Sequence, residues 1–264
     1  MDIRSVLTGA ALAAVFGIAG YFAALKLEEQ KPEPAPVVAL SDAQKDEVRG
    51  LVRDTLVTNP EILEEVSAAL DRKRAEQEAE QRKDVIAAKK DQIFASAADF
   101  AAGNPAGDVT VVEFFDYNCP YCRRALGDID ALLQSDPGVK VVFKEFPVLS
   151  EESYDAALVG IAMQRQGLYM EFHEKLLAHQ GRANKAIAMQ LAQDLGADMA
   201  QIEADVADPK TIETIRQTHA LADELGINGT PAYVIGDQVL VGLAPLTELQ
   251  AQVAEVRQNG CRTC

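Results

Sequence analysis

The sequence predicts an α/β protein, and three stretches carry this prediction. Residues Val109–Phe115 are rich in β-branched and aromatic side chains, which is typical of a buried strand, and residues 139–146 form a similar run. From Pro120 onward, apolar positions recur with the spacing of an amphipathic helix. A further strand follows the turn that ends at Pro231. Strands and helices in this order favour a mixed sheet with helices on both faces.

The first 26 residues predict export from the cytoplasm. An uncharged, moderately apolar run at residues 5–25 lies between Arg4 and Lys26. Its length is near the roughly 20 residues that span a bilayer and exceeds the apolar core, about 7–15 residues long, of a usual signal peptide. We interpret residues 1–26 as a signal anchor. The alternatives are a signal peptide cleaved after residues 17–19 and a buried helix of the soluble part. Either form of export places the rest of the chain outside the cytoplasmic membrane.

Residues 27–40 are predicted to form a proline-rich linker, and residues 41–98 a helical stalk. Ser41 and Gln44 have the spacing of a capping box, which opens a helix that runs to about residue 57. Asn59-Pro60 is expected to cap and begin a second helix.

The second half of the stalk changes character. Residues 71–84 are nearly all charged or Gln, which predicts an exposed helical rod, and apolar positions return at residues 85, 86, 93 and 94, where docking on the next domain is expected. A segment this short cannot build a core of its own. It therefore either pairs with the same segment of other protomers, which we favour, or folds back on its own domain.

The most informative motif is Cys119-Pro120-Tyr121-Cys122, where the first strand meets a helix. Pro120 suits the first helical turn, so Cys119 is placed at the helix N-terminus, where free N–H groups and the helix dipole favour a thiolate. In such motifs the pKa of the first thiol falls from about 8.5 to roughly 3.5–7.5. Cys122 lies one turn further along, is expected to be less exposed, and can resolve a mixed disulfide. The pattern indicates redox chemistry, with a structural disulfide and half of a zinc site as alternatives.

A second signature, Gly229-Thr230-Pro231, leads into the strand that begins at Ala232. With residues 104–108 and 111–122, it resembles the DsbA-like periplasmic thiol–disulfide oxidoreductases of the thioredoxin superfamily. The resemblance covers roughly residues 100–258. It implies a thioredoxin fold with a helical insertion, catalytic roles for Cys119 and Cys122, and a cis bond before Pro231. It also implies that Pro231 lies against the active-site sulfur and shapes the substrate groove with Thr230.

This resemblance defines the expected layout. The DsbA-like domain is placed at residues 99–258, with the helical insertion at about residues 153–225, a hairpin around Gly236-Asp237 and a closing helix at residues 246–256. The preceding stalk makes the chain similar to ScsC-type members of the group, which are oligomeric. A homo-oligomer through the stalk is therefore expected.

Glu113 lies in the first strand, six positions before Cys119, and a carboxylate in such an apolar run is unusual. The resemblance implies that it relays a proton as Cys122 ionises; the alternative is a salt bridge, for example with Lys144. The histidines at 173, 179 and 219 have no convincing metal-ligand spacing. Arg123 and Arg124 either supply positive field near Cys119 or are solvated.

The chain ends in Cys261-Arg262-Thr263-Cys264, a tail at residues 259–264 that the family pattern does not include. An exposed terminal disulfide is the favoured interpretation. A redox shuttle with the first pair and a zinc site completed by it are the alternatives. An even number of cysteines, four in all, suits an oxidising compartment.

Composition limits the partners. A net charge of −16 and a pI near 4.6 exclude nucleic-acid binding through a basic surface. The leading hypothesis is an exported, periplasmic oxidoreductase that needs no cofactor and acts on unfolded or misoxidised exported proteins, recycled by a thiol redox partner. Oxidase and isomerase directions stay open, with a slight preference for isomerase. The rival hypotheses are a membrane-tethered soft-metal-binding protein and a chaperone-like binding protein.

Overall fold

A computed structural model describes residues 40–262; the predicted signal anchor and most of the linker lie outside this range, as does Cys264. The chain divides into two compact units, Met1–Ala68 and Ala69–Cys264, and helix α3 begins in the first and ends in the second. The elements are α2 Asp42–Thr58, α3 Glu61–Ala88, α4 Lys90–Phe94, β1 Phe100–Gly103, β2 Val109–Phe115, α5 Pro120–Ser135, β3 Val139–Glu145, α6 Glu151–Arg165, α7 Tyr169–Ala178, α8 Lys185–Asp194, α9 Met199–Val206, α10 Pro209–Glu224, β4 Ala232–Ile235, β5 Gln238–Val241 and α11 Leu246–Asn259.

Helix α2 begins with the predicted capping box, in which Ser41 Oγ accepts from the Gln44 N–H and the Gln44 side chain accepts from the Ser41 N–H. The prediction that Asn59 caps the next helix is wrong. Asn59 is the C-cap of α2, where its side-chain amide donates to the Thr55 carbonyl at 3.0 Å. The chain then turns through i→i+3 hydrogen bonds, which suit a tight turn at Pro60, before α3 begins at Glu61.

Apolar side chains of the first unit face solvent. Val48, Leu51 and Val52 of α2 are 47–62% exposed, and Leu63 and Val66 of α3 are both 58% exposed. α2 contains no buried residue. Its capping and helix-favouring composition therefore specify the helix, while its apolar face has no intramolecular partner among the described residues.

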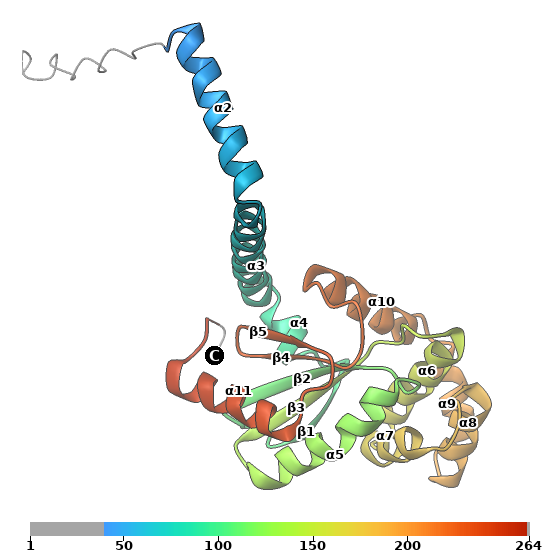
Figure 1. Cartoon of the computed structure of the whole chain (residues 1–264). Coiled ribbons are helices and arrows are strands. Elements are labelled where there is room, and N and C mark those ends of the chain that lie inside the picture. Colours follow the sequence, from blue (N-terminus) through green and yellow to red (C-terminus); the bar gives the residue numbers. More distant parts are fainter. Residues whose placement is uncertain (1–39, 263–264) are drawn as a thin grey trace, which may run out of the picture. The chain divides into compact units, whose positions relative to one another are not determined.

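The second unit is built around a five-stranded sheet in the order β1-β3-β2-β4-β5, with helices on both faces (Figure 1). β2 and β3 pair in parallel, with Val111 opposite Val141, and the other three pairings are antiparallel. The predicted strands at 109–115, 139–146, 232–235 and 238–241 are present. β1 was not predicted, because a four-residue strand of sequence Phe-Ala-Ala-Gly at a sheet edge carries almost no β-propensity signal.

The two faces of the sheet pack against different helices because successive strand residues point to opposite sides. Val111 and Phe115 join the larger core cluster with residues of α5, α7 and α11. Val112 and Phe114 join a second cluster with Ile86 of α3 and Ile93 of α4, both of which are fully buried. The docking predicted for residues 85–94 is confirmed, and Lys89 adds an ion pair to Glu224 of α10 at 2.8 Å.

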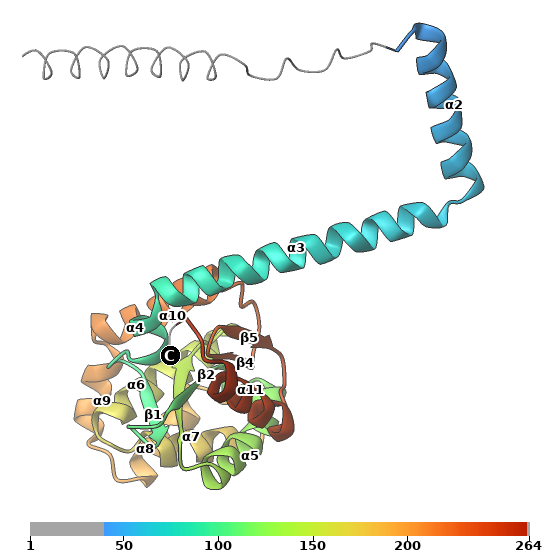
Figure 2. The ribbon, with the colours of Figure 1, turned by 90° about the vertical axis from the view of Figure 1, so that its left-hand side faces the viewer.

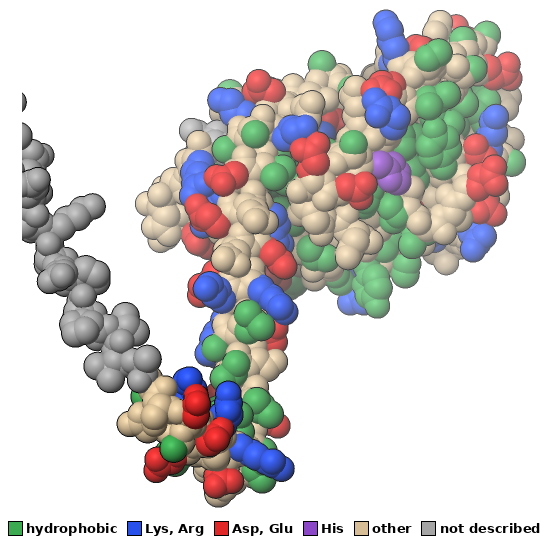
Figure 3. Space-filling model, turned by 90° about the horizontal axis from the view of Figure 1, so that it is seen from above, with side chains coloured by type: hydrophobic (Ala, Val, Ile, Leu, Met, Phe, Trp, Pro, Cys, Tyr) green, Lys and Arg blue, Asp and Glu red, His purple; other side chains and the backbone are tan. Residues whose placement is uncertain are grey.

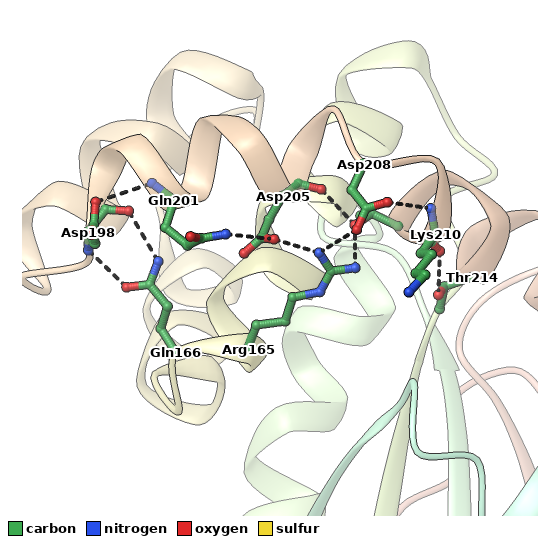
Figure 4. A network of polar contacts seen from close by, with 9 residues as sticks. Arg165, Gln166, Asp198, Gln201, Asp205, Asp208, Lys210 and Thr214 are labelled. Atoms are coloured by element: carbon green, nitrogen blue, oxygen red, sulfur yellow. Dashed lines mark hydrogen bonds and ion pairs between the residues drawn. The ribbon is translucent and has the colours of Figure 1, made fainter.

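Helices α6 to α10 form the predicted insertion. Arg165, at the end of α6, links helices of this insertion through its guanidinium group. It donates to Asp205 at 2.6 Å, to Asp208 at 3.0 Å and to Thr211 at 2.9 Å (Figure 4). Asp208 is also the N-cap of α10. The turns at Gly167 and Gly196 have φ of 74° and 77°, a conformation that favours glycine.

Within residues 40–262, no helix is both long and apolar enough to cross a bilayer. On the face seen in Figure 3, acidic and basic side chains are interspersed rather than gathered into a basic patch.

Candidate active site

The turn from β2 into α5 places Cys119 as the N-cap of α5, with Pro120 in the first helical turn. The backbone of Cys119 is extended, with φ of −76° and ψ of 118°, so its side chain lies beside the free N–H groups at the start of the helix. Both cysteines are free thiols. Cys122 is the less exposed of the two, as expected, at 1% against 3%, and Cys119 is itself buried.

The cover over Cys119 comes from the segment before β4. The Thr230–Pro231 bond is cis, as the resemblance implies, and the Cys119 sulfur lies 3.1 Å from the Thr230 carbonyl oxygen, to which it donates when it is protonated. The Thr230 hydroxyl is buried, and within the described residues it has no hydrogen-bond partner of its own. The cysteine pair therefore lies beside the Thr230–Pro231 segment, although 111 positions separate Cys119 from Thr230.

The two thiols have opposite electrostatic environments. A hydrogen bond from the Cys122 thiol is the largest cause that lowers the pKa of Cys119, to about 5, with further help from Thr230 and the backbone N–H groups of Tyr121 and Cys122. Burial first, and then its hydrogen bond to Cys119 and the nearby Glu113 carboxyl group, raise the pKa of Cys122 far above that of an ordinary thiol. Cys119 is therefore the thiolate of the pair and Cys122 its hydrogen-bond donor.

Glu113 lies beneath this pair in β2 and is 3% exposed. Burial first, and then the nearby Cys119 and Asp130, raise its pKa to about 8, so its carboxyl group holds a proton at neutral pH. Glu113 stands opposite Tyr233 of β4, whose hydroxyl is also buried. The alternative salt bridge to Lys144 is wrong: Lys144 pairs with Asp99 and also donates to the Gln92 carbonyl at 2.8 Å.

Three residues hold the Cys119 loop in place, a role that was not predicted from the sequence for any of them. Asp116 accepts from the N–H of Asn118 at 2.7 Å and from those of Val148 and Leu149 at 2.9 and 3.0 Å. Asn118 exchanges two hydrogen bonds of 2.8 Å with the backbone of Ala183. The loop is thus joined both to the segment after β3 and to the insertion.

Arg123 is the third of these residues. Its guanidinium donates to the carbonyls of Tyr117, His179 and Gly181 at 3.2, 2.7 and 2.7 Å. Arg123 therefore holds the loop in place through hydrogen bonds. This differs from both roles considered from the sequence, a source of positive field near Cys119 and a solvated side chain. The only sequence signal for these roles was the short run Asp116-Tyr117-Asn118 after a strand, which is typical of a side-chain-stabilised turn.

Apolar side chains surround the site. Tyr121, Val148 and Leu149 are 53%, 38% and 54% exposed. A surface pocket next to the cysteines is lined by residues 118, 120, 123, 149, 150, 181 and 182. An unfolded or extended chain can be accommodated on such a surface.

No group of three or more His, Cys, Asp or Glu side chains within residues 40–262 is arranged to hold a metal ion. His173 is packed among Phe115, Phe143 and Tyr169, and burial lowers its pKa to about 3, so its ring is neutral. His219 packs against Phe146.

A reduced cysteine pair at a helix N-terminus, covered by a cis-proline segment of a mixed sheet, defines the thioredoxin-like class of proteins. The chain belongs to the DSBA-like thioredoxin domain family, a family of thiol–disulfide oxidoreductases, whose model matches residues 110–254. The N-terminal domain of the copper resistance protein ScsC matches residues 44–77.

Solved structures agree with this assignment. A thioredoxin-like oxidoreductase from Silicibacter pomeroyi is 42% identical, with a TM-score of 0.62, and the match covers 64% of this chain and 97% of that one. A linker-deletion mutant of Proteus mirabilis ScsC is 29% identical, with a TM-score of 0.63 and coverage of 84% and 99%. The thiol–disulfide exchange protein alpha-DsbA2 of Wolbachia pipientis is 29% identical, with a TM-score of 0.63 and coverage of 67% and 97%.

Among curated proteins, the chain is 31% identical over 172 residues to the Na(+)/H(+) antiporter NhaA 3 of Salinispora tropica. The match covers 62% of this chain and 26% of that protein. The chain thus spans about a quarter of the length of the curated relatives it matches.

Proposed function

We propose that this protein is a thiol–disulfide oxidoreductase that forms or isomerises disulfides in exported proteins through Cys119 and Cys122. The observation that carries the proposal is the pairing of a buried Cys119, with a pKa lowered to about 5, and a Cys122 thiol that donates to it. A thiolate that is stable near neutral pH is both an attacking group and a good leaving group.

The exchange follows from this asymmetry. In the reducing or isomerising direction, the Cys119 thiolate attacks a client disulfide, and the displaced client sulfur takes up a proton. Cys122 then attacks Cys119 of the mixed disulfide, which releases the second client sulfur and leaves a Cys119–Cys122 disulfide. A thiol redox partner returns the pair to the dithiol. In the oxidising direction the same bonds form and break in reverse order.

Glu113 is a nearby group that can exchange a proton with Cys122: it accepts that proton in the minority of molecules in which its carboxyl group is ionised near neutral pH. Cys122 must lose its proton to attack, and burial opposes that loss. With a pKa raised to about 8, Glu113 exchanges a proton readily near neutral pH, directly or through a water molecule. Thr230 and Pro231 shape the groove beside Cys119, where an extended client backbone pairs in the manner of an added strand.

We also propose that the stalk at residues 41–98 makes the protein a homo-oligomer. The exposed apolar residues of α2 and of the start of α3 support this, as does the ScsC N-terminal match over residues 44–77. Several sites that face one client favour isomerisation over simple oxidation. Deletion of residues 41–68 tests the proposal better than a longer deletion, because Ile86 belongs to the core. Light scattering should show a lower oligomeric mass, and isomerisation should fall while dithiol oxidation persists.

A periplasmic location is proposed on the same grounds, with residues 1–26 as a membrane anchor or, alternatively, a cleaved signal peptide.

The proposed activity is tested with a scrambled and a reduced disulfide substrate. The wild-type chain should turn over at least one of them, and Cys119→Ser should turn over neither. If Cys119→Ser matches the wild type, the proposal fails.

Soft-metal binding stays a second candidate, favoured by the copper-resistance name of the protein whose N-terminal domain matches the stalk. Titration of the reduced protein with Cu(I) separates the two. Stoichiometric, tight binding without disulfide turnover would replace the oxidoreductase proposal.

A further inference from the structure

The C-terminal tail, which the proposed function does not use, makes specific contacts with two other elements. Cys261 follows Gly260, the C-cap of α11, and is disulfide-bonded. It lies against Gly236 in the turn between β4 and β5, where an added Cβ would come within 3.3 Å of Cys261 Cβ and 3.7 Å of its sulfur. Glycine is required at this point of the turn by its φ of 56° and by Val256, whose Cγ2 would lie 2.6 Å from an added Cβ.

Arg262 connects this turn to helix α3. Its backbone N–H donates to both carboxylate oxygens of Asp237, at 2.8 and 3.1 Å. Its guanidinium donates to Asp84 at 2.8 Å and pairs with Glu80, one turn earlier on α3. The hydrogen bond from Arg262 is the main cause that lowers the pKa of Glu80. One residue thus bridges three carboxylates on two elements, and Figure 2 shows the β4–β5 hairpin below the C-terminal half of α3.

These contacts lie at the point where α3 meets the domain. Two residues after Asp84, Ile86 is the only buried residue of α3 and part of the second core cluster. The side chains of Arg262, Glu80 and Asp84 are 43%, 54% and 73% exposed, and exposed ion pairs are individually weak. Such pairs gain strength when one partner is already held in place, and a disulfide at the neighbouring Cys261 holds the backbone of Arg262.

The tail is remote from the first cysteine pair. Thr230, which contacts Cys119, precedes β4, whereas Gly236 and Asp237 follow it. At about 3.3 Å per residue, the extended chain from Thr230 to Gly236 spans roughly 20 Å. Direct exchange between the two pairs within one chain, as in the shuttle interpretation, does not fit this separation.

We propose that the Cys261 disulfide is a second redox site, which locks Arg262 onto α3 and releases it when reduced. The reductant is a dithiol, such as another reduced thiol–disulfide oxidoreductase. Its first thiolate attacks the disulfide and forms a mixed disulfide, and its second thiol displaces the tail. Two electrons and two protons pass to the tail, which becomes a pair of thiols, and the reductant becomes a disulfide. Residues 80–85 of α3 then lose their attachment to the β4–β5 turn.

Hydrogen exchange read by mass spectrometry tests this in the full chain. Cys119→Ser/Cys122→Ser serves as the background, so that reduction by dithiothreitol acts on the tail alone and the result is independent of the proposed turnover. We expect reduction to make amides at residues 78–85 exchange roughly two- to fivefold faster, because the contacts of Arg262 with α3 are lost, with α5 unchanged. Arg262→Ala should reproduce this increase in the oxidised protein and abolish the effect of reduction.

Arg216→Ala is the matched control, because Arg216 forms a similarly exposed ion pair with Glu213 on α10. It should leave residues 78–85 unchanged and fully sensitive to reduction. Peptide mapping without reductant should find Cys261 in a disulfide. A free Cys261 thiol in the oxidised protein, equal exchange before and after reduction, or an Arg262→Ala variant that still responds to reduction would each overturn the proposal.

Discussion

The two Cys-X-X-Cys segments of this chain lie at opposite ends of their helices. Cys119 is the N-cap of α5, where backbone N–H groups and the Cys122 thiol surround its sulfur. Cys261 follows the C-cap of α11 and lies beside Asp237 and Gly236 of the β4–β5 turn. The N-terminal end of α5 presents free N–H donors to the Cys119 sulfur, whereas the C-terminal end of a helix such as α11 presents free carbonyl oxygens.

The comparison shows that the spacing of two cysteines does not decide their chemistry. The same two-residue spacing gives free thiols in the first segment, whereas Cys261 in the second is engaged in a disulfide. The first segment is buried and covered by Thr230 and Pro231, and the carboxyl group of Glu113 lies next to it. We expect position on a helix and the neighbouring polar groups to direct turnover to the first pair and attachment to the second.

The largest expected effect separates the two segments directly. Cys119→Ser should lower disulfide turnover by at least about a thousandfold, because no other described sulfur occupies a helix N-terminus beside a cis-proline. Cys122→Ser should accumulate mixed disulfides with client proteins, since the resolving thiol is gone. Turnover by Cys119→Ser within tenfold of wild type would assign the reaction elsewhere.

Replacement of Glu113 by Gln should change the pH dependence of stability. The folded-state pKa of about 8 lies above the unfolded value of 4.5, so the folded state retains a proton that the unfolded state loses. The wild type should therefore lose stability as pH rises from about 4.5 to about 8, by up to about 1.4 kcal/mol per pH unit, and Glu113→Gln should not.

The measurement is urea unfolding across this pH range, with the exposed Glu171→Gln as the control variant. Glu113→Gln should become the more stable protein by up to a few kcal/mol near pH 8, whereas Glu171→Gln should follow the wild type. Parallel curves for wild type and Glu113→Gln would show that Glu113 is ionised in the folded protein. A proton-relay role also predicts slower release of mixed disulfides by Glu113→Gln.

Thr230→Val tests the contribution of the cover over Cys119. The substitution keeps the shape and the backbone carbonyl but removes a buried hydroxyl that has no hydrogen-bond partner among the described residues and is therefore available to donate to a Cys119 thiolate. The pKa of Cys119 should rise by roughly one unit, and alkylation below neutral pH should slow accordingly. An unchanged alkylation profile would remove Thr230 from the electrostatics of the site and leave it only a role in shaping the groove.

The smallest expected effect belongs to the second segment. Cys261→Ser should leave turnover of a small disulfide substrate within about twofold of wild type, because the tail lies at the other end of β4. A loss comparable to that of Cys119→Ser would indicate that the tail takes part in the exchange and would remove the distinction between the segments.

The sequence was sufficient for the elements with strong local signals. The strands at 109–115 and 232–235, the helix start at Pro120 and the capping box at Ser41 follow from β-branched runs, a first-turn proline and a Ser–Gln spacing. The placement of Thr230 beside Cys119 followed from family resemblance rather than from pattern.

The rest depends on contacts between distant segments, which a single sequence does not encode locally. Nothing in the sequence indicated that Asp116 would bind the backbone at residues 148–149 or that Arg123 would reach the carbonyls of His179 and Gly181. Cys119 lies at a helix start, a position that is usually exposed, yet the segment before β4 covers it. Asn59 was assigned to the wrong helix because Asn-Pro is compatible with either side of such a turn.

The most direct test of the account is the pH titration of the Cys119 thiolate, followed by its ultraviolet absorbance in a Cys261→Ser/Cys264→Ser chain. This variant leaves only the first pair to titrate. A single thiolate should appear with a midpoint near pH 5, and no second one should form below about pH 9. Replacement of Cys122 by Ala should raise that midpoint, because its thiol is the main stabilising donor. A midpoint above about pH 8 would mean that Cys119 is an ordinary thiol and would contradict the account.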